Sequence, residues 1–146
     1  MIKVNFRKLN ENATAPTYGT EFSAGADLYA CVNGVDTFKA GASKLIHTGL
    51  SLEIPVGYAG LINARSGIAT NRGLAPANKV CVIDADYRGE IMVCLHNHSN
   101  TAQTIADKER IAQLVITPFL KGEYTETDEL SETVRGAGGF GSTGKK

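Results

Sequence analysis

Two carboxylates, an aromatic ring and a guanidinium stand close together in the run Ile83-Asp84-Ala85-Asp86-Tyr87-Arg88-Gly89. Asp84 directly follows the apolar run VCVI, so we expect its carboxylate to be partly desolvated. A carboxylate in that state can serve as a general base or a metal ligand. The alternative is a plain hairpin turn in which the aspartates accept hydrogen bonds from backbone amides. The residues of this run leave both interpretations open.

A second candidate site is the stretch ARSGIA at residues 64–69, where an arginine, a serine and a glycine separate a predicted strand from a predicted short helix. Backbone amides at such a junction can bind an anion. The triplet R-S-G is common in proteins, however, and has little specificity by itself.

A third candidate is the chain end, RGAGGFGSTGKK at residues 135–146. Gly136, Gly138 and Gly141 satisfy G-x-G-x-x-G, and residues 139–146 come within one residue of G-x-x-x-x-G-K-[ST]. Both motifs bind phosphate where the glycine turn leads into a helix, and we expect no helix after this segment. The segment is therefore either a disordered terminus or a phosphate-binding loop of another kind. A cation, an aromatic ring and two hydroxyls favour the second interpretation: Arg135, Phe140, Ser142 and Thr143.

His96 and His98 raise the hypothesis of a metal site, because a strand would place them on one face with Glu90 and Cys94. The apolar residues at positions 91, 93 and 95 favour the alternative, a strand of an antiparallel sheet whose histidines face solvent. We prefer the solvent-facing interpretation.

The composition restricts the class of protein. A chain of 146 residues is long enough for one domain with a single core. Its 15 basic and 15 acidic side chains give a net charge of zero, which argues against a surface for long nucleic acid. The three cysteines form no C-x-x-C pair, which argues against a zinc site and favours a reducing, cytoplasmic location. The sequence contains no apolar run of membrane-spanning length.

Short apolar runs with a period of two position these candidates. In LSLEI at residues 50–54, apolar residues alternate with Ser51 and Glu53, which predicts a strand with one solvent-facing side. Further strands are predicted at residues 3–6, 28–32, 58–64, 80–83, 91–95 and 111–116. The helix candidates are residues 66–71 and the acidic stretch 128–134, and we expect at most one short helix to form. Many short strands between turn residues indicate an all-β, jelly-roll-like sandwich or barrel.

Five segments, taken in order, resemble the five motifs of the trimeric deoxyuridine triphosphate nucleotidohydrolases, the dUTPases. They are SAGADLYA (23–30), ARSGIA (64–69), NKVCVIDADYRGEI (78–91), KERIAQL (108–114) and RGAGGFGSTG (135–144). Each segment is weak by itself, but five in order within one domain are specific and span nearly the whole chain. Cys81 departs from the family, where this position is usually glycine, and the departure affects the packing of the hairpin rather than the chemistry.

The resemblance implies a jelly-roll domain at residues 1–134 and a mobile tail at residues 135–146 that closes over nucleotide. It implies hydrolysis of dUTP to dUMP and pyrophosphate, which limits uracil in DNA and supplies dUMP for thymidylate synthesis. Asp84 matches the carboxylate that activates water for attack on the α-phosphorus. The implied cofactor is Mg²⁺, held mainly by the substrate phosphates. No side chain is expected to ligate the ion directly, and Asp27 is the candidate for a contact through water.

The resemblance also implies which residues bind substrate. Backbone groups of the hairpin and the amide of Asn78 would read uracil, and the ring of Tyr87 would carry the deoxyribose. The loop at residues 65–67, Gln113 and the tail would contact phosphate oxygens. The full set is Arg65, Ser66, Gly67, Asn78, Val82, Ile83, Asp84, Tyr87, Met92, Gln113, Arg135, Phe140, Gly141, Ser142 and Thr143.

The implied assembly is a homotrimer with composite sites. In the family, the second and fourth motifs come from one subunit, the hairpin from the next and the tail from the third. The implied partner is dUTP, with neither nucleic acid nor a membrane. Two other functions stay open. The related deoxycytidine triphosphate deaminases share the jelly roll, although Tyr87 and the closing glycine-rich motif favour dUTP hydrolysis. A dUTPase-like scaffold can also act as a nucleotide-gated regulator, for which residues 128–132 are a candidate contact surface.

Overall fold

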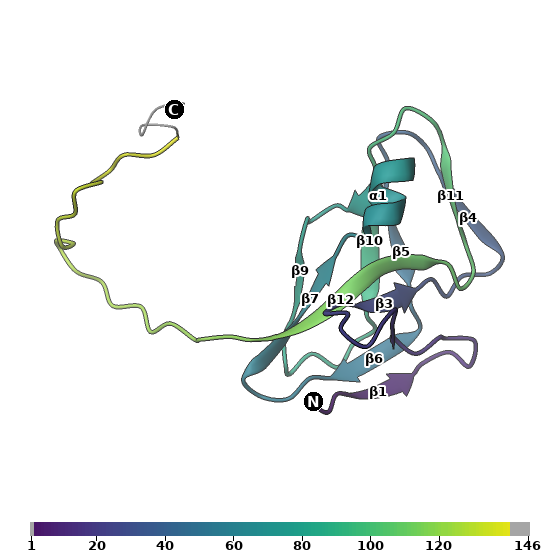
Figure 1. Ribbon diagram of the computed structural model, residues 1–146, viewed down its shortest axis with the longest axis horizontal. Coiled ribbons are helices and arrows are strands. Elements are labelled where there is room, and N and C mark those ends of the chain that lie inside the picture. Colours follow the sequence, from purple (N-terminus) through teal and green to yellow (C-terminus); the bar gives the residue numbers. More distant parts are fainter. Residues whose placement is uncertain (1, 141–146) are drawn as a thin grey trace.

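The computed structural model describes residues 2–140, which form short strands and one helix (Figure 1). The strands are β1 (Asn5–Lys8), β2 (Thr17–Tyr18), β3 (Ala26–Tyr29), β4 (Val35–Phe38), β5 (Ser43–His47), β6 (Leu50–Glu53), β7 (Tyr58–Asn63), β8 (Leu74–Pro76), β9 (Cys81–Ile83), β10 (Met92–Asn97), β11 (Gln103–Ala106) and β12 (Arg110–Pro118). The helix of this part of the chain is α1 (Ser66–Arg72). The prediction of an all-β fold with at most one short helix is confirmed.

The strands pair antiparallel in four small sheets. The largest has the order β2-β3-β12-β7-β9, and the others are β5-β10-β8, β1-β6 and β11-β4. The long strand β12 lies at the centre of the largest sheet, between β3 and β7 (Figure 1). Its register places Gln113 opposite both Asp27 on β3 and Asn63 on β7. Polar residues that are far apart in the sequence therefore become neighbours in the middle of this sheet.

A single aliphatic core holds the sheets together. One cluster of buried side chains draws on all four sheets and on α1. Full burial of one leucine or isoleucine stabilises the fold by about 1.5–3 kcal/mol relative to exposure. The members of the buried cluster are Leu28, Ala30, Phe38, Ile46, Leu52, Ile54, Ile62, Ile68, Leu74, Ile83, Ile91, Val93, Leu95, Ile105, Ile111, Ala112 and Leu114.

Several strands differ from the prediction. In β6 the serine expected at the surface is buried, and its hydroxyl is satisfied by a hydrogen bond of 2.8 Å that Ser51 Oγ donates to the carbonyl of Arg88. Strands β2, β4, β5, β8 and β11 were not predicted. Each has at most two buried residues, so few apolar side chains mark these strands in the sequence. Tertiary pairing, and not local pattern, defines these strands.

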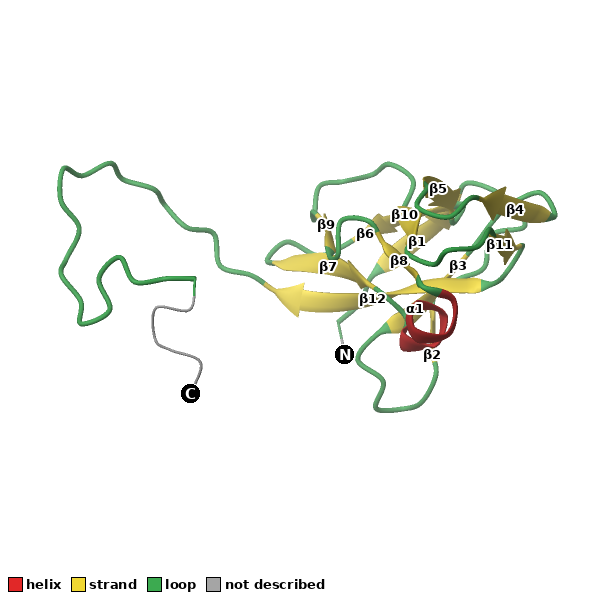
Figure 2. Ribbon diagram, turned by 90° about the horizontal axis from the view of Figure 1, so that it is seen from above, coloured by secondary structure: helices red, strands yellow, loops and turns green. Residues whose placement is uncertain are grey.

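The chain beyond β12 runs away from the body of the molecule (Figures 1 and 2). From residue 119 to residue 140 it contains neither helix nor strand, so the helix candidate at residues 128–134 is wrong. Leu130 and Val134 are exposed, and a seven-residue helix without a packed apolar face is not stable in water. Within residues 2–140, no helix has the length and apolar character needed to cross a membrane.

The three cysteines are free and partly buried. Cys81 packs against the core from β9. Burial, followed by the nearby carboxylates of Asp107 and Glu90, raises the pKa of the Cys31 thiol. Cys31 is therefore poorly suited to act as a nucleophile.

Candidate active site

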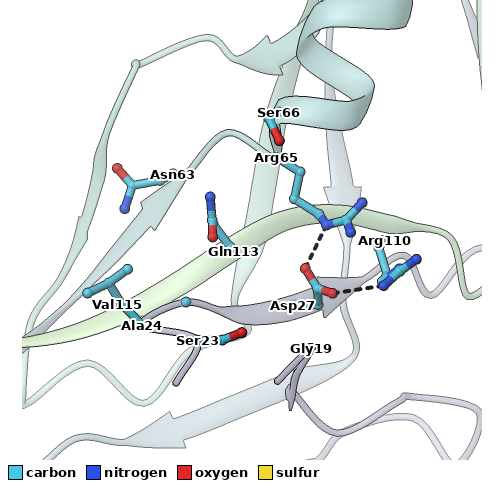
Figure 3. Close-up of a pocket in the computed structure, with 11 residues that line it drawn as sticks. Gly19, Ser23, Ala24, Asp27, Asn63, Arg65, Ser66, Arg110, Gln113 and Val115 are labelled. Atoms are coloured by element: carbon cyan, nitrogen blue, oxygen red, sulfur yellow. Dashed lines mark hydrogen bonds and ion pairs between the residues drawn. The ribbon is translucent and has the colours of Figure 1, made fainter. Parts of the chain in front are cut away.

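A polar cleft lies where the end of β7 and the start of α1 face β3 and β12 (Figure 3). Its volume is about 440 Å³. The lining residues are Gly19, Ser23, Ala24, Gly25, Asp27, Asn63, Arg65, Ser66, Arg110, Gln113 and Val115. Three of the residues predicted to touch substrate phosphates meet here, namely Arg65, Ser66 and Gln113, together with Asp27.

The loop between β7 and α1 brings the predicted R-S-G triplet to the cleft. Arg65 occupies the N-cap position of α1 with an extended backbone, and its side chain does not cap the helix. The side chain turns instead toward β3 (Figure 3). A Cβ atom added to Gly67 would meet nothing within 4 Å, so space is open beside the first helical turn. The guanidinium of Arg65, the hydroxyl of Ser66 and the uncovered backbone at Gly67 therefore lie together at this loop.

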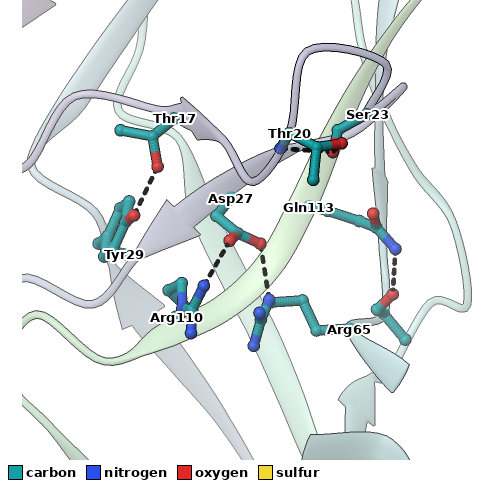
Figure 4. A network of polar contacts seen from close by, with 9 residues as sticks. Thr17, Thr20, Ser23, Asp27, Tyr29, Arg65, Arg110 and Gln113 are labelled. Atoms are coloured by element: carbon teal, nitrogen blue, oxygen red, sulfur yellow. Dashed lines mark hydrogen bonds and ion pairs between the residues drawn. The ribbon is translucent and has the colours of Figure 1, made fainter. Parts of the chain in front are cut away.

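Asp27 joins two arginines at the centre of the cleft (Figure 4). Arg65 Nε donates a hydrogen bond of 2.6 Å to Oδ1, and Arg110 Nη1 donates one of 3.2 Å to Oδ2. The Asp27 side chain is only 12% exposed, whereas the Arg110 side chain is 52% exposed. One carboxylate thus offsets part of the charge of two guanidiniums, whose remaining N–H groups are still available as donors. The cleft keeps an excess of positive charge, which suits an anionic ligand.

Sequence reasoning missed Arg110. Arg110 belongs to the KERIAQL segment, which also contains the predicted site residue Gln113. A basic residue at the end of a strand is usually exposed to solvent without a binding role, so this nearness was not a sufficient signal. Its role depends on the pairing of β12 with β3, which brings it to Asp27 across 83 residues of sequence. Both carboxylate oxygens of Asp27 contact arginine, and its contact to Mg²⁺ through water stays a prediction.

Gln113 fixes the backbone that precedes Arg65. Its Nε2 donates a hydrogen bond of 2.9 Å to the carbonyl of Ala64 (Figure 4). A Cβ atom added to Gly25 would lie 2.4 Å from Gln113 Oε1 and 3.1 Å from Gln113 Cβ. The side-chain amide of Gln113 therefore occupies space that only a glycine at position 25 leaves open. Gly25 in the SAGADLYA segment is therefore needed for the position of Gln113.

The hairpin that carries Asp84 lies elsewhere on the chain. Among residues 2–140, strand β9 pairs only with β7 and ends the order of the largest sheet, and the turn that follows projects from this edge. Ile83 is buried, but Asp84, Asn78, Val82 and Tyr87 are exposed. The prediction that Asp84 is partly desolvated is therefore wrong for the single chain. The reason is that the edge strand has only one neighbour to cover it.

Asp84 and the phosphate-site residues line different hollows of the same chain. Asp84 faces a hollow with Asp86, Arg88 and residues 119–122, and this hollow shares no lining residue with the cleft around Asp27. Met92 begins β10, in a third place, where it pairs with His47. Asp84 and the cleft residues thus do not share a hollow within one chain.

The described part of the tail makes only local contacts. Arg135 Nε donates a hydrogen bond of 2.8 Å to the carbonyl of Gly138, and Phe140 is fully exposed. Gly136 has a φ of 49° and donates to Thr133, which gives a local turn. The predicted tail residues Gly141, Ser142 and Thr143 lie outside the described residues.

His96 lies on β10 and His98 follows the end of that strand. The rings of His96 and His98 lie 4.4 Å apart edge to face, and His96 Nδ1 is 2.9 Å from Ser43 Oγ. Among residues 2–140, no group of three or more histidine, cysteine, aspartate or glutamate side chains is placed to hold a metal ion. The alternation of buried 91, 93 and 95 with more exposed partners agrees with a solvent-facing pair.

Known proteins resemble this chain over almost its full length. The family model for dUTPase matches residues 11–144. The deoxyuridine 5'-triphosphate nucleotidohydrolase of Nautilia profundicola is 50% identical over 144 residues, which are 99% of this chain and all of the relative. The enzyme of the same name from Hydrogenobaculum sp. is 46% identical over 145 residues, again 99% of this chain and all of the relative.

Solved structures show the same fold. A mutant of the dUTPase of Staphylococcus bacteriophage 80alpha, solved with dUpNHpp, has a TM-score of 0.87 and 26% identity, with 97% of this chain and 98% of that chain covered. A mutant dUTPase of phage phi11 of S. aureus, described with a structural Mg(II) ion, has a TM-score of 0.80 and 23% identity, with 89% and 99% covered. The expected jelly roll is thereby confirmed.

Proposed function

This chain belongs to the dUTPase family and hydrolyses dUTP to dUMP and pyrophosphate, and we propose that it does so at composite sites shared by three copies of the chain. The observation that carries the proposal is the separation of Asp84 from the arginine cleft within one chain. A base and the phosphates that it acts on must lie within hydrogen-bond reach of a common water. A neighbouring copy that sets its hairpin against this cleft satisfies that requirement.

In the proposed reaction, the exposed carboxylate of Asp84 accepts a proton from a water molecule. The water oxygen forms a bond to the α-phosphorus, the bond from that phosphorus to the bridging oxygen breaks, and pyrophosphate leaves with the electron pair. The neighbouring subunit would cover Asp84 and provide the desolvation that the single chain lacks. Asp84→Asn chains should then be inactive at every site that receives their hairpin.

The cleft around Asp27 is the proposed triphosphate site. Arg65 and Arg110 provide the positive charge, and Ser66 and the backbone near Gly67 provide further donors. Asp27 positions the two guanidiniums, and Gln113 positions the backbone before Arg65. The cleft combines charge, donors and a fixed backbone, which is what binding of three linked phosphates requires.

Base and sugar selection are proposed for the hairpin. Strand β9 (Cys81–Ile83) is an edge strand, so the backbone groups on the side away from β7 are free to pair with the Watson-Crick edge of uracil. Asn78 and Met92 would border the base, and Tyr87 would lie against the deoxyribose. The exocyclic amine of cytosine is a hydrogen-bond donor and would face backbone donors that pair with a carbonyl of uracil. Both groups would then lack a partner, which makes the rejection of cytosine strong.

The tail at residues 135–146 is the proposed lid. It would stack Phe140 on the uracil and bring Arg135, Gly141, Ser142 and Thr143 to the phosphates. The outward course of the chain after Pro118, with exposed Leu120 and Phe140, supports a tail that reaches another subunit. We also propose a cytoplasmic enzyme, which the free cysteines favour.

The donor set of this chain fits Mg²⁺ held by the substrate. Asp27 is engaged by arginine, and the described residues offer no carboxylate cage, so a hard cation would be bound mainly by phosphate oxygens and water. When bound, the ion would offset the negative charge of the triphosphate. Asp27 would reach it at most through water.

A mixing experiment tests the composite site. One variant is Asp84→Asn with an intact tail, and the other is truncated before Arg135 with Asp84 intact. Each should be inactive alone. After co-refolding at equal amounts, a site needs Asp84 from a truncated chain and a tail from an Asp84→Asn chain, so about a quarter of sites should recover in a three-fold ring. No recovery would show that hairpin and tail come from the same chain.

A further inference from the structure

Gly89 packs against the ring of Tyr87. A Cβ atom added to Gly89 would lie 2.3 Å from the Tyr87 hydroxyl oxygen, 2.5 Å from Cζ and 2.9 Å from Cε2. Close-packed protein atoms do not tolerate such approaches, so the ring can hold this position only beside a residue without a side chain. The φ of Gly89 lies outside the left-handed region. The ring, and not the backbone conformation, therefore requires glycine here.

Tyr87 makes two hydrogen bonds within the hairpin, one through its ring and one through its backbone. Its hydroxyl donates a hydrogen bond of 3.0 Å to the carbonyl of Glu90. Its backbone N–H donates one of 3.2 Å to the carbonyl of Asp84. The ring thus folds back over the two residues that follow it, and the same turn carries the proposed base.

The segment on which the ring lies is fixed to the chain at residues 49–51. A displaced segment would lose hydrogen bonds on both sides of Gly89, whereas the ring can turn about its own side-chain bonds. An added methyl group is therefore expected to move the ring and leave the backbone in place. The hydrogen bonds that fix the segment around Gly89 run from Ser51 Oγ to the Arg88 carbonyl (2.8 Å), from Gly49 N to Glu90 Oε1 (2.8 Å) and from Ile91 N to the Leu50 carbonyl (2.7 Å).

We propose that Gly89 determines sugar specificity by setting where the Tyr87 ring lies. The inference rests on the proposed contact between this ring and the deoxyribose. A ring held over Gly89 excludes a 2'-hydroxyl only while it stays there, because the exclusion is a steric contact with little spare room. Gly89 itself touches no substrate in this arrangement and acts as a positioning residue.

The test compares Gly89→Ala with Tyr87→Ala in pyrophosphate release from dUTP and UTP. Both variants should lower the ratio of kcat/KM for dUTP to that for UTP, by on the order of tenfold. A purely structural defect would lower both values and leave their ratio unchanged. The control is Asp36→Asn, because Asp36 on β4 pairs with Lys44 on β5, outside both the hairpin and the cleft. The control should keep the wild-type ratio.

The double variant Tyr87→Ala/Gly89→Ala separates the possible causes. Without the ring there is nothing for the new Cβ to displace, so Gly89→Ala should change the ratio no further in this background. An equal additional fall would overturn the inference. If Gly89→Ala does not fold, recovery of folding in the double variant supports the collision, and continued failure to fold refutes it.

Tyr87→Ala distinguishes failure of this inference from failure of the proposed function. If Tyr87→Ala lowers the ratio and Gly89→Ala does not, the ring selects the sugar but Gly89 does not position it. If neither variant changes the ratio, the proposed role of Tyr87 fails and the inference fails with it.

Discussion

Replacement of Asp27 by asparagine tests the double ion pair in the phosphate cleft. The Asp27 side chain is 12% exposed, and its carboxylate accepts hydrogen bonds from Arg65 at 2.6 Å and from Arg110 at 3.2 Å. Asparagine keeps the shape and one acceptor oxygen, but its amide nitrogen is a donor that would face a second donor. The variant therefore loses one of two charge-assisted hydrogen bonds and leaves two guanidiniums without a counter-charge.

The expected loss of unfolding free energy is about 2–3 kcal/mol. A hydrogen bond to a charged group contributes about 1.5–3 kcal/mol, and removal of one partner of a fully buried pair costs about 3–5 kcal/mol. The lower range applies because the Arg110 side chain is 52% exposed, so water can solvate its released charge. We also expect kcat/KM for dUTP to fall by about tenfold, since Arg65 would lose its orientation.

Asp36→Asn is the matched control. Asp36 pairs with Lys44 at 2.7 Å, but the two side chains are 31% and 38% exposed. Exposed pairs contribute at most about 1 kcal/mol, so this variant should lose less than that and keep normal turnover.

Urea unfolding at one fixed protein concentration is the measurement, because the stability of an oligomer depends on concentration. Equal losses for Asp27→Asn and Asp36→Asn would refute the reasoning about burial. A loss of stability with unchanged kcat/KM would instead show that the arginines bind phosphate without orientation by Asp27.

Two further predictions concern the chemistry. Asp84→Asn should lower kcat by roughly 10²-fold or more, because the amide keeps the shape of the carboxylate without its proton affinity. Binding of dUTP, measured by calorimetry, should stay nearly unchanged. Near-normal turnover would exclude Asp84 as the base. Chelation of Mg²⁺ should lower turnover but leave the melting temperature of the nucleotide-free protein unchanged, because the ion is expected to arrive with the substrate phosphates. A lower melting temperature after chelation would instead indicate an ion bound by the protein itself.

Local pattern in the sequence determined the class of fold and the chemical groups. The period of two in the run at residues 91–95 reports burial on one face of a strand, and this signal needs no knowledge of the partner strand. In LSLEI the same pattern predicted a strand, but Ser51 is buried with its leucine neighbours. The five ordered segments likewise contain Arg65, Asp84 and Gln113. The chemical groups that a reaction needs can be identified from residue types alone, without knowledge of the fold. The helix candidate at residues 128–134 shows the limit of such patterns, since a short helix needs a packing surface that the sequence does not display.

Only the tertiary structure decided which of these groups meet. Arg110 became a site residue through the register of β12 against β3, across 83 residues of sequence, and strand register is set by long-range packing. The requirement for glycine at positions 25 and 89 arises from side chains that lie over them, and a sequence shows only that glycine is present. The exposure of Asp84 has the same origin: an apolar run predicts burial of the strand, but the number of neighbours at its edge decides how much water reaches the residue that follows.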